Sequence, residues 1–213
     1  MDFVSLIDLT ILNPDCSIDD KKRICEEAIS HQFAAVCVHH YYVKDAARLL
    51  EGEKVKVCTV IGFPFGYTAT VSKIDEIKRA IIDDTDELDV VINIAAVKSG
   101  HWNHIKNDID SITIAAHLRG RVIKIVFETS LLTKDEIKRL CEICNEKGVD
   151  FVKTSNGFNG SGTTEEMVRF LKENHSSKII IKAAGGIKTK KQAETLIRAG
   201  ADLLGTSSGL AFV

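Results

Sequence analysis

The 213-residue chain lacks three features that would each indicate a whole class of protein. It has no excess of charge, because 28 Lys and Arg stand against 30 Asp and Glu, and this argues against nucleic acid or an anionic membrane as its main partner. It has no apolar run of membrane-spanning length and no signal-like start, so we expect a cytoplasmic protein. It has no linker or low-complexity stretch, which predicts a single domain over residues 1–213.

The sequence also lacks a recognisable metal-binding or disulfide pattern. Its six cysteines are scattered, and in a cytoplasmic chain we expect them to be reduced. Cys141 and Cys144 form a C-x-x-C pair, but they lie in a helix-like pattern and no second pair stands at zinc-site spacing. His39 and His40 are adjacent, so on extended backbone they point in opposite directions, and we expect them in a loop. The sequence therefore predicts no metal site.

What the chain does contain is a regular alternation of two patterns. Short apolar and β-branched runs predict eight strands, at Leu6–Thr10, Ala35–Val38, Val55–Ile61, Leu88–Asn93, Val122–Phe127, Asp150–Thr154, Ile179–Ala183 and Asp202–Gly205. Amphipathic segments between them predict helices, at Ile18–His31, Lys44–Glu51, Val71–Asp83, Asn103–His117, Lys134–Lys147, Thr164–Asn174 and Lys190–Ala199.

Strands that alternate with helices form parallel sheets, and eight such units in this length predict a closed (β/α)8 TIM barrel. An open doubly wound sheet is the alternative. Against it, the turn after Thr10 carries no glycine-rich dinucleotide-binding motif.

Polar residues interrupt several of the predicted strands, and the period-two alternation of a strand turns all of them to one face. The residues turned inward are Asp8, Asp89, Asn93, Lys124, Glu128, Lys153 and Lys182. A barrel interior is normally filled by Val, Ile and Leu, so this cluster of charges predicts a functional site.

Two of the inward residues, Lys153 and Lys182, come at the ends of similar apolar runs. A lysine is rarely buried without compensation, so a purely structural interpretation would give each lysine a partner carboxylate. The functional interpretation is that repulsion from Lys182 keeps Lys153 partly deprotonated, which makes it an amine nucleophile for a carbonyl substrate. Asp89 would offset this repulsion and could pass a proton.

The turns after the last two predicted strands are rich in glycine and hydroxyl groups. Their exposed backbone N–H groups and side-chain donors predict a phosphate site, which TIM barrels commonly have at this place. The predicted residues are Gly185, Gly186, Gly205, Thr206, Ser207 and Ser208. The alternative is two ordinary glycine turns, with Thr206 and Ser207 capping a last helix.

Taken together, seven segments closely resemble the deoxyribose-phosphate aldolases, which are class I aldolases with a TIM barrel. The segments are Ile7–Thr10 (IDLT), Ala35–Val38 (AVCV), Val60–Pro64 (VIGFP), Asp86–Asn93 (DELDVVIN), Lys124–Thr129 (KIVFET), Phe151–Ser155 (FVKTS) and Lys182–Ile187 (KAAGGI). The chain departs from the family pattern at Leu9, Thr85 and Asn156.

The resemblance implies that Lys153 forms a Schiff base, that Lys182 tunes it and that Asp89 relays protons. It also implies that Asp8, Cys37, Lys124 and Thr154 surround the substrate. The expected reaction is reversible cleavage of 2-deoxy-D-ribose 5-phosphate to acetaldehyde and D-glyceraldehyde 3-phosphate, a catabolic step that needs no cofactor. The expected partners are therefore small phosphosugars and aldehydes, and a homo-oligomer is expected. Two other functions stay open, namely another phosphosugar isomerase or ketose aldolase, and a barrel that binds phosphorylated ligands without catalysis.

Overall fold

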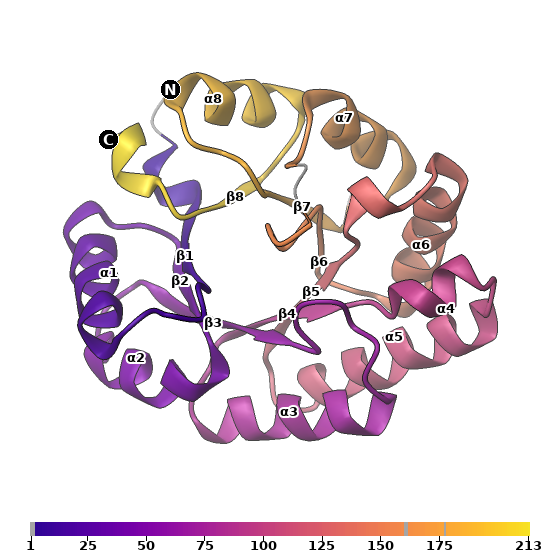
Figure 1. The fold of residues 1–213 in the computed structure, drawn as a ribbon, viewed down its shortest axis with the longest axis horizontal. Coiled ribbons are helices and arrows are strands. Elements are labelled where there is room, and N and C mark those ends of the chain that lie inside the picture. The colour runs from indigo at the N-terminus through magenta and orange to yellow at the C-terminus, as the bar shows by residue number, and fades with distance from the viewer. Residues whose placement is uncertain (1–2, 160–161, 177) are drawn as a thin grey trace.

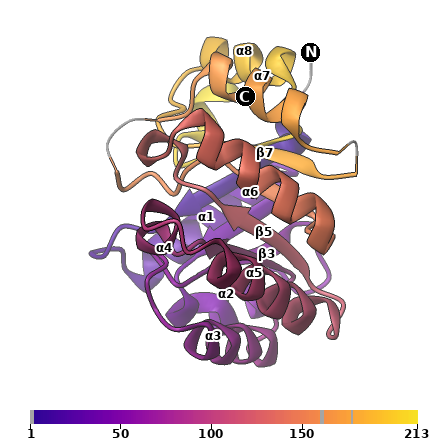
Figure 2. The same cartoon turned by 90° about the vertical axis from the view of Figure 1, so that its right-hand side faces the viewer.

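Eight parallel strands, hydrogen-bonded in chain order, close into a barrel in the computed structural model, which describes residues 3–159, 162–176 and 178–213. Figure 1 looks down this barrel and shows the helices arranged around it, and Figure 2 shows the same molecule from the side. The strands are β1 (Ile7–Ile11), β2 (Ala35–Val38), β3 (Lys56–Ile61), β4 (Glu87–Val91), β5 (Val122–Val126), β6 (Phe151–Lys153), β7 (Ile180–Ala184) and β8 (Leu203–Thr206). The architecture is a (β/α)8 TIM barrel, as the alternation predicts.

The α-helices that cover the barrel are α1 (Ile18–His31), α2 (Val43–Leu49), α3 (Thr70–Ile82), α4 (Ile94–Lys98), α5 (Trp102–His117), α6 (Lys134–Lys147), α7 (Glu165–Asn174) and α8 (Lys190–Ala199). All seven predicted helices are confirmed, with ends that differ by at most two residues. The short helix α4 is missing from the prediction because five residues are too few to show a helical period. No helix among the described residues is long and apolar enough to cross a membrane.

Local sequence signals fix where several of these helices begin and end. Ser17 and Asp20 form a reciprocal capping box at the start of α1, and Thr133 and Glu136 form another at the start of α6. Gly148 ends α6 in the left-handed region at φ 68°, where a residue without a Cβ is favoured. The turn at Gly148 leads into β6, the strand that carries Lys153.

The strands have an apolar outer face and a polar inner face. The outward residues of β4 and β5, such as Leu88, Val90 and Ile125, are fully buried in the main hydrophobic core beneath the helices. The inward residues include five of the predicted set, Asp8, Asp89, Lys124, Lys153 and Lys182, together with a small apolar cluster of Leu12, Ala35, Cys37, Cys58 and Val60. The other two lie beyond the strand ends: Asn93 caps α4, where its side chain accepts from the Ala96 N–H at 3.1 Å, and Glu128 follows β5. The predicted alternation of faces is therefore confirmed on these strands.

A second buried polar contact lies outside the barrel, between α3 and α5. The Nζ atom of Lys73 lies 2.7 Å from Oδ2 of Asp108, and the Thr70 hydroxyl donates to Oδ1 of the same carboxylate at 2.6 Å. Both charged side chains are at most 2 % exposed. This ion pair joins two neighbouring helices and is distinct from the charges inside the barrel.

Candidate active site

Asp89 is the centre of the charged cluster inside the barrel. Its Oδ2 atom accepts from Lys153 Nζ at 2.6 Å and from Lys182 Nζ at 2.8 Å, and its Oδ1 atom accepts from Lys124 Nζ at 3.0 Å. All four side chains are at most 2 % exposed. The register explains the convergence, because Asp89 is paired with Lys124 across β4 and β5 while Lys153 is paired with Lys182 across β6 and β7.

Two further carboxylates complete the charge balance. Asp8 forms an ion pair with Lys182, and Glu87 forms one with Lys124 at 2.5 Å. Three lysines therefore share the barrel interior with three acids. Every lysine of the cluster has an acidic partner, which is the arrangement that makes buried charges tolerable.

These contacts decide which groups are charged. Burial alone would raise the pKa of Asp89, but the ammonium groups of Lys124, Lys153 and Lys182 hold it well below its usual range. Burial would likewise lower the pKa of Lys182, but Asp8 and Asp89 raise it well above its usual value. Asp89 is therefore a carboxylate and Lys182 an ammonium group at neutral pH.

A cavity of about 320 Å³ opens at the carboxyl ends of the strands. It is lined by Thr10, Leu12, Asn13, Lys153, Asn156, Gly157, Phe158, Ala184, Gly185, Gly186, Ile187, Lys188, Gly205, Thr206 and Ser207. Lys153 alone of the three interior lysines is among these residues, whereas Lys124, Lys182 and Asp89 lie deeper in the barrel. A ligand in this cavity would therefore meet the amine of Lys153 first.

Five of the six residues predicted for phosphate line the same cavity. Gly185 and Gly186 follow β7, Gly205 and Thr206 end β8, and Ser207 follows it. Gly185 and Gly186 both have positive φ, 92° and 73°, which an L side chain rarely adopts. Ser208 is the exception, because it does not line the cavity and its N–H donates to the Thr206 hydroxyl at 2.9 Å. That hydroxyl itself donates to the Ile187 carbonyl at 2.7 Å, so Thr206 shapes the turn.

None of the four residues that the resemblance implies around the substrate lines the cavity. Asp8 and Lys124 belong to the buried charged cluster, and the other two lie in different surroundings. The Thr154 hydroxyl donates to the Ala184 carbonyl at 3.0 Å and accepts from the Ala184 N–H at 2.9 Å, so it joins the end of β6 to β7. Cys37 lies in the apolar cluster of the barrel interior with Cys58. Neither side chain lines the cavity.

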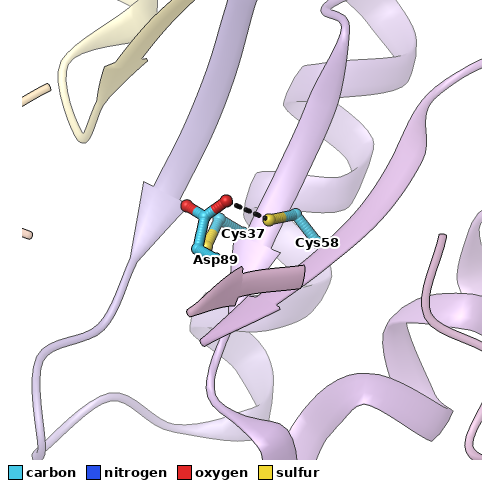
Figure 3. Close-up of side chains that lie close together, drawn as sticks. All are labelled: Cys37, Cys58 and Asp89. Carbon is cyan, nitrogen blue, oxygen red and sulfur yellow. Dashed lines mark hydrogen bonds between the residues drawn. The ribbon is translucent and has the colours of Figure 1, made fainter. Parts of the chain in front are cut away.

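Two groups of ligand-type atoms lie inside the barrel among the described residues, and within each group the atoms are within 4.8 Å of one another. One is formed by Cys37, Cys58 and Asp89 (Figure 3), and the other by Asp8, Cys58 and Glu87, so Cys58 belongs to both. The Cys58 thiol donates to Asp89 Oδ1 at 3.4 Å, and burial keeps the pKa of this thiol well above its usual value. Lys124 Nζ lies 3.0 Å from the same carboxylate oxygen. A protonated thiol and an adjacent ammonium group make a poor cation site.

Sequence reasoning missed two members of the cluster, Glu87 and Cys58. Glu87 pairs with Lys124, and Cys58 Sγ lies 3.3 Å from Lys124 Nζ. The signal that could have found them is the alternation itself, because Glu87 shares a face with Asp89, and Cys58 with Val60.

Asn156, a departure from the family pattern, holds the loop after β6 in place. Its N–H donates to the Glu128 carboxylate and its side-chain amide donates to the Pro64 carbonyl, which lies after β3. Asn159 also donates to Glu128, at 2.7 Å. Glu128 has a positive φ of 55°, and burial raises its pKa. Glu128 therefore positions a wall of the cavity, although the alternation alone placed it in the charged cluster.

Comparison with known proteins shows which family the chain belongs to. The family model of the DeoC/LacD family aldolases matches residues 3–213. The deoxyribose-phosphate aldolase of Thermococcus gammatolerans is 45 % identical over 215 residues, covering all of this chain and 96 % of that protein.

Two solved structures give the same result. The aldolase QR15 superposes with a TM-score of 0.94 at 39 % identity, covering 99 % of this chain and 94 % of that one. The deoxyribose phosphate aldolase of Aeropyrum pernix, described as a tetramer, has a TM-score of 0.91 at 29 % identity and covers 99 % and 88 %. The chain belongs to the DeoC/LacD family of aldolases.

Proposed function

We propose that this chain catalyses the reversible aldol cleavage of 2-deoxy-D-ribose 5-phosphate to acetaldehyde and D-glyceraldehyde 3-phosphate through a Schiff base on Lys153. The observation that carries the proposal is the amine of Lys153, the interior lysine that lines the cavity while remaining bonded to Asp89 at 2.6 Å. The names of the relatives support the substrate.

The first step is attack of the Lys153 amine on the aldehyde carbon of the open-chain sugar. The C–N bond forms, the carbonyl oxygen leaves as water, and a protonated imine results. Asp89 Oδ2 accepts from both Lys153 and Lys182, so the carboxylate holds the amine in position, and we assign to it the relay of protons in the later steps. Lys182 stays charged beside it on the same oxygen of Asp89, and we assign to it the tuning of this amine.

The second step breaks the bond between C2 and C3 of the sugar. The C3 hydroxyl gives up its proton, glyceraldehyde 3-phosphate leaves, and the electron pair of the broken bond moves into the imine to give an enamine. Protonation of the enamine at C2 and hydrolysis of the imine then release acetaldehyde and regenerate Lys153. The protein's own amine is the electron sink, so no cofactor enters the proposal.

The glycine and hydroxyl residues that line the cavity suit a phosphate. Gly185, Gly186 and Gly205 carry no side chain that would keep an anion away from the backbone, and the hydroxyl of Ser207 lies beside them. Lys188 is exposed at the same rim and can add positive charge. These groups would fix the 5-phosphate and so direct the aldehyde end of the sugar toward Lys153.

The test is the intact mass of the chain after incubation with acetaldehyde and borohydride. We expect one added ethyl group on the wild type, located at Lys153, and none on Lys153→Ala. Lys188→Ala is the matched control, because it removes a second cavity lysine and should still be trapped. An adduct that survives Lys153→Ala rules out the assignment, and trapping by dihydroxyacetone phosphate in place of acetaldehyde indicates a ketose aldolase. Absence of any adduct would favour a barrel that only binds its ligand.

A further inference from the structure

A second group of reactive side chains lies outside the aldolase site, where the loops after β1 and β2 meet. Cys16, which precedes α1, is partly exposed, whereas the other five cysteines of the chain are buried. Lys21 in the first turn of α1 and His39 after β2 both contact its sulfur. None of these three side chains lines the cavity that contains Lys153.

The contacts of His39 define its tautomer. Its Nε2 atom lies 2.8 Å from the carbonyl oxygen of Leu12, which can only accept a hydrogen bond, so Nε2 carries the hydrogen. The lone pair is therefore on Nδ1, which lies 3.6 Å from Cys16 Sγ. Burial lowers the pKa of His39, as does the nearby charge of Lys21, so the ring is neutral and can accept the thiol proton.

Lys21 has an unusual environment for a fully buried lysine. Within the described part of the chain no carboxylate lies at ion-pair distance from its Nζ atom, which instead lies 2.5 Å from Cys16 Sγ and 4.7 Å from the centre of the Tyr42 ring. A buried ammonium group without a counter-ion is costly. A thiolate at Cys16 would supply the missing negative charge.

A hydrogen bond also fixes the backbone at Cys16, whose sulfur is the nucleophile of this group. The Tyr42 hydroxyl donates to the Cys16 carbonyl at 3.1 Å, so the loop after β1 is tied to the segment after β2 at Cys16 as well as at Leu12. A nucleophile in contact with a base, and a base oriented by a third group, is the general arrangement of an activated thiol.

We propose that Cys16 is a second nucleophile of this chain, activated by His39 and Lys21, and that its substrate class is a peroxide. Sγ attacks one oxygen of hydrogen peroxide, the S–O bond forms and the O–O bond breaks. The thiol proton passes to His39 Nδ1 and from there to the departing hydroxide, which leaves as water. Sulfur is oxidised to a sulfenic acid and the peroxide is reduced, and Lys21 stabilises the thiolate before attack.

The other five thiols are protected from the same reaction, Cys37 because it is fully buried and the remaining four by burial together with their pKa values. Burial raises the pKa of Cys25 to about 11 and that of Cys141 to about 12, and it also raises the pKa values of Cys58 and Cys144. Thiols of this kind are poor nucleophiles because little thiolate is present. The modification is therefore expected at one position.

The experiment is treatment of the full chain with limiting hydrogen peroxide, capture of sulfenic acid by dimedone, and peptide mapping. We expect Cys16 to be labelled first, and the rate to fall at least about tenfold in His39→Gln and in Lys21→Met. His39→Gln is the more specific variant. Its amide can still donate a hydrogen bond to the Leu12 carbonyl, but it cannot accept the proton of the Cys16 thiol. Should Lys21→Met fail to fold, Lys21→Gln takes its place.

Three controls make the outcome decisive. Cys16→Ser should lose the label and still be trapped by acetaldehyde and borohydride at Lys153, which separates this site from the aldolase reaction. Iodoacetamide should alkylate Cys16 with the same order of rates among the variants. First labelling at any other cysteine, or wild-type rates in His39→Gln together with both Lys21 variants, would overturn the proposal.

Discussion

Lys153 and Lys182 stand opposite each other on β6 and β7, and their Nζ atoms both donate to one oxygen atom, Oδ2 of Asp89. Two cations on one oxygen repel each other, while the shared carboxylate attracts both. The two lysines differ in whether a ligand can reach them, because Lys153 lines the cavity and Lys182 is fully buried. This asymmetry is the structural reason for assigning the nucleophile to Lys153.

The first prediction compares the two lysines that assist Lys153. Removing Lys182 takes a cation from the oxygen that Lys153 uses, whereas removing Lys124 takes one from the other oxygen of Asp89. We expect Lys182→Met to slow trapping by acetaldehyde and borohydride about tenfold or more, and Lys124→Met to slow it less. Trapping rates at pH 7 measure the difference. Equal slowing in both variants would contradict a specific role for Lys182.

A second prediction concerns the stability of the cluster. Asp89→Asn leaves three buried lysines with two acids, so we expect the free energy of unfolding at pH 7 to fall by about 3–5 kcal/mol. Asp110→Asn is the matched control, because Asp110 is 42 % exposed and pairs with Lys147 at 3.1 Å. It should cost less than about 1 kcal/mol. Urea denaturation of the three proteins gives both values.

The same variant gives a pH test with a defined sign. The folded-state pKa of Asp89 lies well below the unfolded value, so its contribution to stability is fully present above the unfolded pKa of about 3.9. As the pH falls further, the unfolded state binds the proton first and the contribution is lost. The stability gap between wild type and Asp89→Asn should therefore be constant near neutrality and narrow below about pH 4. A gap that widens on acidification would show that the cluster is not held by the ionised carboxylate.

A third prediction tests the phosphate site. Gly186→Ala places a Cβ at a positive φ of 73°, 3.3 Å from Gly162 Cα, and would shift the turn that we assign to phosphate. We expect a higher KM for 2-deoxyribose 5-phosphate and little change in kcat/KM for 2-deoxyribose. Gly120→Ala is the control for backbone strain alone, because Gly120 has a φ of 64° and open space around its Cβ position. Equal losses for both sugars would remove the role of Gly186 in binding phosphate.

A fourth prediction separates two roles for Thr154. If its hydroxyl serves only to join β6 to β7, Thr154→Val should lower stability by about 1–3 kcal/mol, because the Ala184 N–H and carbonyl both lose a partner. KM for the phosphosugar should stay unchanged, and Thr154→Ser should restore the stability. A KM that rises in Thr154→Val while the unfolding free energy stays constant would instead support direct contact with the substrate.

A fifth prediction concerns metals. Because a protonated Cys58 thiol and the Lys124 ammonium group flank the carboxylate of Asp89, we expect exhaustive treatment with EDTA to leave the rate of cleavage unchanged. The rate of aldehyde release before and after treatment measures this. Loss of activity that added zinc restores would mean that Cys37, Cys58 and Asp89 hold an ion after all.

The fold was predictable because its signals are local and repeated. Each strand is short, apolar and β-branched, and capping residues such as Ser17 and Thr133 mark helix starts. The inner face was predictable for the same reason, since a period of two places Asp89 opposite to Leu88 and Val90 on β4. Such patterns require only a few neighbouring residues.

The remaining features depend on pairs that are distant in the sequence. Lys73 and Asp108 are 35 positions apart and carry no signal that they meet between α3 and α5. The sequence also does not predict that Lys153 lines the cavity while Lys124 lies deeper in the barrel, because the alternation places both on the inner face. Depth along the barrel axis is set by the stagger of the strands, which emerges only when the barrel closes.

The pairing of Asp8 with Lys182 spans 174 positions, from the first strand to the seventh, and β8 then fits between these strands by pairing with both. During synthesis on the ribosome Asp8 therefore emerges first, and its partner Lys182 follows only when nearly the whole chain has been made. A partly made chain therefore lacks the complete cluster of charges in which we place the nucleophile Lys153. We therefore expect borohydride trapping to appear during refolding at the time when the barrel closes.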